Sequence, residues 1–127
     1  MNGKFLTILT ILFVLLATIA SSTPLEKRGD IHVTSPGPGP WKRGSVQVVS
    51  WWCNPCSPKD NVVVRIIQYG SGTLPRVVFT GIGKNAHAGS LPFKIGSDWD
   101  VKKKYFALVT LARSVRVSGR GVDFTIY

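Results

Sequence analysis

Acidic, histidine and cysteine residues are scarce in this sequence. Its 127 residues include six Asp and Glu, two His and two Cys, against 16 Lys and Arg, and the net charge is +10. A G-x-S-x-G nucleophile motif and a phosphate-cradling glycine loop are also missing from the sequence. With so few bases, nucleophiles and metal ligands, the composition predicts a protein that is not an enzyme and that holds no metal ion or other cofactor.

Sustained helical periodicity is the second thing the chain lacks. After residue 28 no stretch keeps an apolar period of 3.6 residues, and β-branched runs alternate with Gly, Pro and Asn. Seven short strands within one domain predict an all-β fold, an antiparallel β-sandwich. The expected strands are residues 30–35, 45–52, 61–69, 76–81, 90–95, 104–111 and 122–127, with turns at 70–72 and 81–83.

The strand patterns differ in kind. Residues 61–69 are apolar at almost every position, which predicts a central strand covered at least partly on both faces. In the last expected strand Val122, Phe124 and Ile126 alternate with Asp123 and Thr125, which predicts one core face and one solvent face.

The long apolar run of the chain stands at its N-terminus. Lys4 precedes the apolar residues 5–20, and small residues follow, so residues 1–22 are typical of a helical signal peptide rather than a transmembrane anchor. Residues 23–28 form a short propeptide or linker that ends in Lys27-Arg28, which is either a dibasic processing site or an ordinary solvated pair. We therefore expect a secreted domain spanning residues 29–127 without a transmembrane anchor.

The positive charge is concentrated in that domain. Three of the 16 basic residues and one of the six acids precede Gly29, which leaves 13 basic and five acidic residues and a net charge of +8. Such a charge predicts attraction to anionic surfaces, or simply confers solubility. Nucleic acid is not the expected partner of a secreted chain without base-stacking motifs. The candidate anion-binding residues are Lys102, Lys103 and Lys104, joined by Arg116 and Arg120 if these lie on one hairpin beside the lysines.

The two cysteines, Cys53 and Cys56, are expected to form a disulfide, because secretion exposes them to an oxidising environment. A redox role would need a βαβ context, and a zinc site would need two further ligands. His32 and His87 are distant in sequence, so we interpret the pair as a turn disulfide and both histidines as surface residues.

Aromatic residues supply the candidate ligand contacts. Trp51 is expected in the core and Trp52 on the opposite face of the same strand, exposed. Trp99 lies between Asp98 and Asp100. It either caps one end of the sandwich or contacts a ligand, and in the second case the two carboxylates accept hydrogen bonds from the hydroxyl groups of that ligand. The alternative for the two acids is a solvated loop with local charge pairing.

The order of motifs resembles the fungal Kre9/Knh1-like cell-wall domain. Residues 31–36 (IHVTSP), 41–45 (WKRGS) and a strand that closes on Trp51 are similar to the opening of that domain, residues 89–93 (GSLPF) and 105–109 (YFALV) to later strands, and 121–126 (GVDFTI) to its end. The resemblance implies an immunoglobulin-like sandwich in a secreted or wall-associated protein linked to β-1,6-glucan assembly. Unlike that family, the chain has no Ser/Thr-rich stalk and carries the Cys53–Cys56 insert.

These observations lead to two functional hypotheses, beside a third, a purely structural wall protein. The first is a secreted non-catalytic domain, extracellular or associated with the cell wall, that binds or organises glucan or another glycan. The second is a diffusible effector that binds a host protein, an anionic membrane or an anionic polysaccharide through its basic residues.

Overall fold

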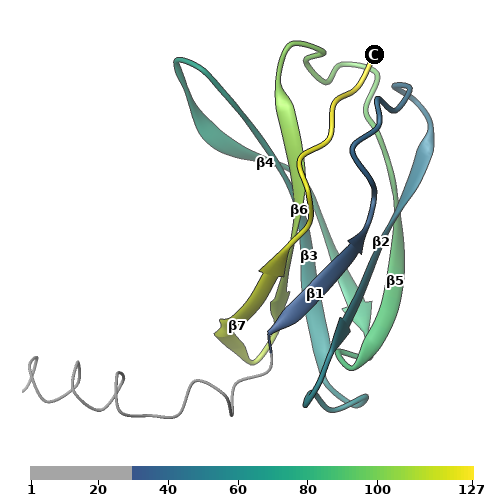
Figure 1. The fold of residues 1–127 in the computed structure, drawn as a ribbon, viewed down its shortest axis with the longest axis vertical. Coiled ribbons are helices and arrows are strands. Elements are labelled where there is room, and N and C mark those ends of the chain that lie inside the picture. The colour runs from purple at the N-terminus through teal and green to yellow at the C-terminus, as the bar shows by residue number, and fades with distance from the viewer. Residues whose placement is uncertain (1–29) are drawn as a thin grey trace, which may run out of the picture.

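The computed structural model describes residues 30–127, so the predicted signal peptide, the linker and Lys27-Arg28 lie outside the described residues. The described part folds into seven strands (Figure 1). They are β1 (Ile31–Ser35), β2 (Val46–Cys53), β3 (Asn61–Gly70), β4 (Thr73–Lys84), β5 (Ala88–Lys94), β6 (Lys104–Leu111) and β7 (Ser114–Arg120). None of these residues belongs to a helix that could span a bilayer.

The strands form two antiparallel sheets that pack as a sandwich. The three-stranded sheet has the order β1-β2-β5 and the four-stranded sheet the order β4-β3-β6-β7. This is an immunoglobulin-like arrangement in which the fourth strand joins the larger sheet. The prediction of an all-β, immunoglobulin-like sandwich of about seven strands is confirmed.

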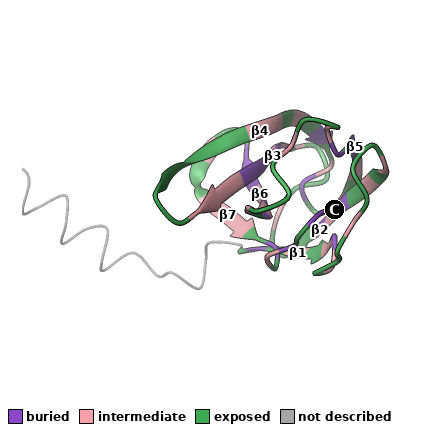
Figure 2. Cartoon of the chain, turned by 90° about the horizontal axis from the view of Figure 1, so that it is seen from above, coloured by how far each residue is buried: buried purple, intermediate pink, exposed green. Residues whose placement is uncertain are grey.

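Alternation along the strands builds the core between the sheets. In β3 the side chains of Val62, Val64 and Ile66 are fully buried, while Val63 and Arg65 on the outer face are half-buried. Figure 2 colours the strands by this burial. The predicted central strand is therefore confirmed, with one face in the core and the other only partly covered. Trp51 is 2% exposed and donates its indole N–H to the Asn85 carbonyl oxygen, which confirms it as a core residue.

The prediction for the last strand is wrong. The seventh strand is Ser114–Arg120, which pairs with β6 as a hairpin. Residues 121–127 belong to no strand, and their β-pairing consists of isolated bridges, Tyr105 with Phe124 and Trp41 with Ile126. Phe124 and Ile126 are buried as expected, but Val122 is 57% exposed. The alternating pattern thus correctly predicted that these side chains are buried between the sheets, but not that the segment pairs as a strand.

The turn expected at residues 81–83 is also wrong, because β4 continues through it. The reason is packing: a Cβ added to Gly83 would lie 2.5 Å from the Trp51 ring, and one added to Gly81 would lie 2.7 Å from Leu91. These glycines leave room for large core side chains inside a strand. The turn at residues 70–72 is confirmed, since Gly70 pairs with Thr73.

A tyrosine corner fixes the connection between β5 and β6. Tyr105, the second residue of β6, is fully buried and donates its hydroxyl to the Asp100 carbonyl oxygen at 2.7 Å. Gln68 of β3 donates to the same hydroxyl oxygen at 2.8 Å. A tyrosine that closes the corner before the sixth strand is a hallmark of immunoglobulin-like sandwiches. It holds the loop that carries Asp98, Trp99 and Asp100 against the end of the core.

Candidate functional site

Trp52 is the exposed tryptophan of β2, as the alternation predicts. Its side chain lies on the outer face of the three-stranded sheet and is 45% exposed. The His32 ring, across the β1–β2 pair, stacks on the indole with 3.9 Å between centroids and 14° between planes. The residue paired with Trp52 on the other side is Ala88 of β5. Alanine is small, so Ala88 can cover little of the indole on that side.

The described residues of β1, β2 and β5 place almost no charge on the face around Trp52. The outward residues of the three strands include Val46 and Val48, which are 62% and 41% exposed, and the polar Ser50 and Ser90. Its one Lys or Arg, Lys94, pairs with Val46, six residues along β5 from Ala88 and roughly 20 Å away at strand spacing. We call this surface the tryptophan face: His32, Val46, Val48, Ser50, Trp52, Ala88, Ser90 and Pro92.

Trp99 has a different environment. Its ring lies parallel to Tyr105 at 5.2 Å and 17°, and to Phe93 at 6.4 Å and 14°, so it closes one end of the core. This is the capping role that the sequence left open beside ligand contact. One edge of the ring still reaches a pocket of about 430 Å³, the aspartate pocket, which is lined by Gln68, Arg76, Val77, Val78, Asp98, Trp99 and Asp100.

The two carboxylates of this loop are not equivalent. Asp100 accepts a hydrogen bond from the Lys102 backbone N–H at 2.8 Å, so its carboxylate orders the turn. Neither Asp98 nor Asp100 belongs to an ion pair within residues 30–127. Both acids are exposed, as the alternative of a solvated loop predicts, but the local charge pairing has no support in the described part of the chain.

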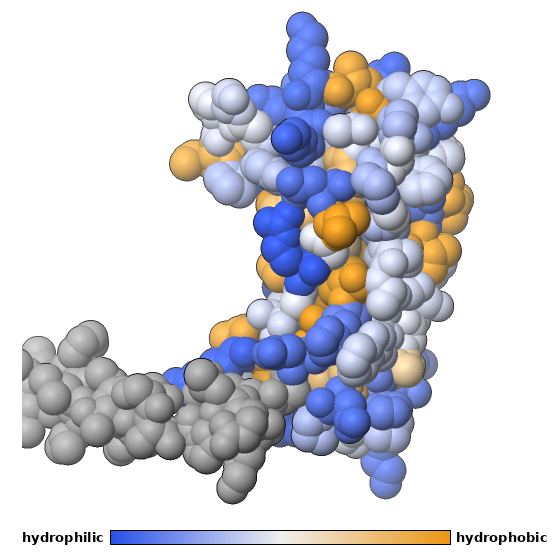
Figure 3. Space-filling model, viewed as in Figure 1, coloured by the Kyte–Doolittle hydropathy of each residue, from blue (hydrophilic) through white to orange (hydrophobic). Residues whose placement is uncertain are grey.

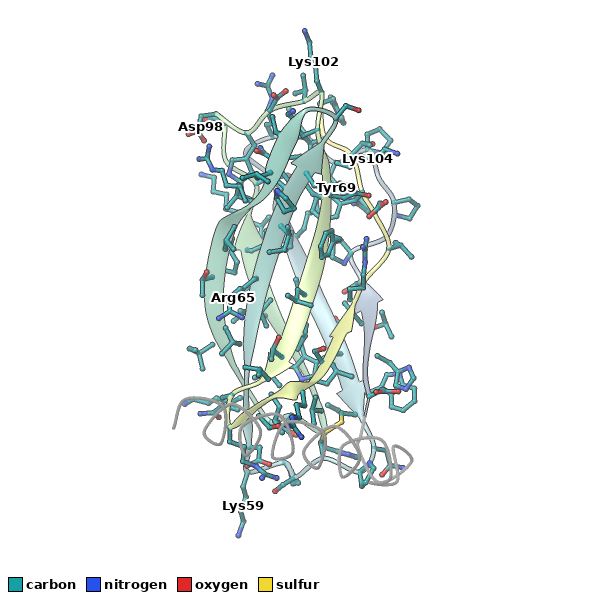
Figure 4. All side chains as sticks on the ribbon, turned by 90° about the vertical axis from the view of Figure 1, so that its left-hand side faces the viewer. Lys59, Arg65, Tyr69, Asp98, Lys102 and Lys104 are labelled. Atoms are coloured by element: carbon teal, nitrogen blue, oxygen red, sulfur yellow. A yellow bond between two sulfur atoms is a disulfide. The ribbon has the colours of Figure 1, made fainter. Side chains whose placement is uncertain are left out.

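The three lysines point to different places. The Lys103 ammonium donates a hydrogen bond to the Thr73 hydroxyl at 3.1 Å, and the Lys103 side chain lies against Gly70. These contacts join the β3–β4 hairpin to the lysine segment, residues 102–104. Lys102 and Lys104 remain exposed at the same end of the molecule, near Tyr69 (Figure 4). They line a second pocket of about 400 Å³, the lysine pocket, together with Tyr69, Gly70 and Ser71.

The two predicted arginines are separated along β7. Arg120 lies level with Leu108, four residues from Lys104, whereas Arg116 lies level with the end of β6, at Thr110 and Leu111, roughly 20 Å from Lys104. The structure thus brings Arg120 toward the lysines and leaves Arg116 near the other end of the sheet. A single patch containing all five cations does not form.

Arg120 is held by its neighbours. Its guanidinium lies 3.7 Å from the centroid of the Phe106 ring and pairs with Asp123. Tyr69 packs edge-on against Phe106 and donates its hydroxyl to the same carboxylate. That hydrogen bond to Asp123 is the main reason why the pKa of Tyr69 is raised. Tyr69 and Phe106 were not predicted as site residues. Their role depends on contacts between β3, β6 and the segment after β7, which the sequence pattern does not show.

The outer face of the four-stranded sheet is hollow. Figure 3 shows the hollow between the β3–β4 hairpin and the β6–β7 hairpin, with apolar and strongly polar atoms side by side. Arg65 lies in the middle of this face (Figure 4), in register with Leu108 and hence with Arg120 across the sheet. Val77 and Ile82 of β4 are 48% and 57% exposed.

The cysteines form the expected disulfide. Cys53 and Cys56 are bonded, with their Cα atoms 5.3 Å apart, and Cys53 is buried at the end of β2. The ring nitrogen Nδ1 of His87 lies 3.0 Å from the Cys53 carbonyl oxygen. Within residues 30–127 no three His, Cys, Asp or Glu side chains gather in a way that could hold a metal ion.

Comparisons with known proteins assign no family, since no protein-family model and no curated protein sequence matches this chain.

Proposed function

We propose that this protein is a secreted, non-catalytic domain of the fungal cell wall or extracellular matrix that binds or organises glucan, β-1,6-glucan in particular, or another glycan. The observation that carries the proposal is the exposed Trp52 indole on a nearly uncharged sheet face. A flat aromatic ring binds sugar by covering its apolar C–H face, and this contribution depends on buried area rather than on charge.

The surroundings of Trp52 suit such a ligand. The His32 ring stacks on one face of the indole, and the strand neighbour of Trp52 on the other side is the small Ala88. A rigid ring loses little side-chain entropy on binding, which favours affinity. The nearby Ser50 and Ser90 can exchange hydrogen bonds with sugar hydroxyl groups.

Membership of the Kre9/Knh1-like family is part of the same proposal. It rests on the motifs in the sequence, and the immunoglobulin-like sandwich is the fold that this resemblance implies. Within this proposal the tryptophan face supplies the contact with neutral polysaccharide.

A pull-down of the secreted protein on insoluble β-1,6-glucan, β-1,3-glucan and chitin, at low and high salt, tests the proposal. We expect retention on glucan at high salt, lost in Trp52→Ala and kept in Leu74→Ala, which truncates an 88% exposed residue of the β3–β4 hairpin. Loss of retention in both variants, or no retention of the unmodified protein on any matrix, would contradict glycan binding through Trp52.

The second candidate function is a diffusible effector that binds an anionic partner. It is favoured by the hollow outer face of the four-stranded sheet, where Arg65 and Arg120 share a register and Val77 and Ile82 of β4 are exposed. Binding there should weaken steeply as ionic strength rises, because salt screens exposed charges. Salt sensitivity of the retained fraction therefore separates the two functions.

A further inference from the structure

Two pockets of opposite charge flank the end of the β3–β4 hairpin. On one side the aspartate pocket presents Asp98 and Asp100 against one arginine, Arg76, and on the other the lysine pocket presents Lys102 and Lys104. The hairpin stands between them, because Gln68 lines the first and Tyr69, Gly70 and Ser71 line the second. The two carboxylates therefore do not line the pocket that holds the two ammonium groups.

The lysine pocket has fixed walls. Lys103 holds the hairpin through its bond to Thr73, and a Cβ added to Gly70 would lie 2.7 Å from the Lys103 side chain, so hairpin and lysine segment are in close contact. Tyr69 is paired with Lys104 across the strands, and its ring packs against Phe106. The walls of the pocket are therefore held in position by packed side chains, although Lys102 and Lys104 themselves are exposed.

Among the residues that the structure describes, no acid lines the lysine pocket. The two acids nearby have other partners: Asp100 accepts the Lys102 backbone N–H, and Asp123 pairs with Arg120 and accepts the Tyr69 hydroxyl. Neither Lys102 nor Lys104 belongs to an ion pair among the described residues. Two unpaired ammonium groups beside the Ser71 hydroxyl offer donors to an oxyanion.

We propose that the lysine pocket binds a phosphate or sulfate group carried by a sugar. Its volume of about 400 Å³ exceeds what one oxyanion fills and falls within the roughly 300–1,000 Å³ of small-molecule sites. The oxyanion contacts Lys102 and Lys104, and the attached sugar ring lies against the Tyr69 ring. The sugar as carrier rests on the proposed function, whereas the oxyanion site itself does not.

Titration of the isotope-labelled protein by NMR with glucose 6-phosphate, and with glucose as the matched neutral sugar, tests the site. We expect glucose 6-phosphate, but not glucose, to shift the amide signals of Ser71, Lys102 and Lys104, and to do so in Trp52→Ala as well. Persistence in that variant separates this proposal from failure of the glycan-binding proposal.

A charge-matched pair of variants tests specificity. The double substitution Lys102→Gln and Lys104→Gln should weaken glucose 6-phosphate binding at least tenfold, whereas Lys84→Gln with Lys94→Gln, which removes the same charge elsewhere, should change it less than twofold. Equal weakening by both pairs would reduce the effect to net charge and overturn the site. Binding to phosphatidylserine vesicles, without shifts caused by glucose 6-phosphate, would overturn the sugar as carrier.

Discussion

Alanine substitutions at Trp52 and Trp99 should have opposite effects on binding and stability. Trp52 is 45% exposed, and its main partner is the His32 ring, so its removal should lower the free energy of unfolding by about 1 kcal/mol, the scale of one aromatic pair. If a sugar covers about 100 Å² of the indole, roughly half of a tryptophan surface, the lost contact is worth about 2.5 kcal/mol at 25 cal/mol per Å². Imperfect contact reduces this value, and because tenfold in affinity is about 1.4 kcal/mol, we expect a loss of affinity of at least tenfold.

Trp99 should behave as a core residue. Truncating a buried tryptophan costs about 3–5 kcal/mol, and because Trp99 is only partly buried we expect about 2–3 kcal/mol from the loss of its contacts with Tyr105 and Phe93. Glycan affinity, measured below the unfolding transition, should stay within twofold of the unmodified protein.

Urea denaturation followed by far-ultraviolet circular dichroism, paired with depletion binding to insoluble glucan, measures both quantities. Trp52→Phe keeps a flat ring and should retain part of the affinity. The reasoning is refuted if Trp99→Ala binds at least tenfold more weakly while its unfolding midpoint is unchanged, because the ring would then contact ligand rather than cap the core.

Three further predictions concern the fold. Gly119→Ala should destabilise the domain by about 3 kcal/mol or more, because its Cβ would lie 1.6 Å from the Ile31 carbonyl oxygen where β7 meets β1; thermal unfolding measures this, and Gly37→Ala, with open space around it, should be neutral. Replacing Cys53 and Cys56 together with alanine should cost about 2 kcal/mol from loop closure, and an unchanged urea midpoint would show that the disulfide contributes nothing to stability. Asp123→Asn should lower the pKa of Tyr69 toward its ordinary value of 10.0, as followed by phenolate absorbance. Because the folded-state pKa is raised, the stabilising effect of this hydrogen bond is present at neutral pH and disappears as the pH rises through the folded-state pKa, so an alkaline stability curve that is identical for the variant would contradict it.

Much of the fold follows from local pattern. Short β-branched runs between turn residues predicted six of the seven strands to within a few residues, because alternation and turn chemistry are local properties. The seventh failed since Phe124 and Ile126 alternate into the core without a ladder, while Ser114–Arg120 pairs only because it follows β6 in a hairpin. The turn predicted at residues 81–83 was wrong for a similar reason. Gly81 and Gly83 leave room for the side chains of Leu91 and Trp51, which are distant in sequence.

The candidate site was predicted less completely, because it depends on which segments meet. Exposure of Trp52 follows from strand alternation alone, and it was predicted. The capping position of Trp99 depends on Tyr105, and the lysine pocket depends on Tyr69, a residue more than thirty positions earlier in the chain. The spacing of residues in the sequence does not determine such contacts. The basic residues could therefore be predicted as candidates, but not which of them lie together.

The two proposed contacts lie on different sheets, and this has a measurable consequence. Trp52 stands on the outer face of the three-stranded sheet, and Lys104 belongs to the other sheet, whose outer face points away from it. Substitutions at sites this distant and without shared partners add in free energy. On a polysaccharide that carries both neutral and sulfated or phosphorylated sugars, the affinity losses of Trp52→Ala and of Lys102→Gln with Lys104→Gln should therefore multiply in the triple variant, with only the second loss disappearing at high salt. If the triple variant binds no more weakly than one of its parents, the two surfaces do not act on the same chain of sugars, and the protein uses one face alone.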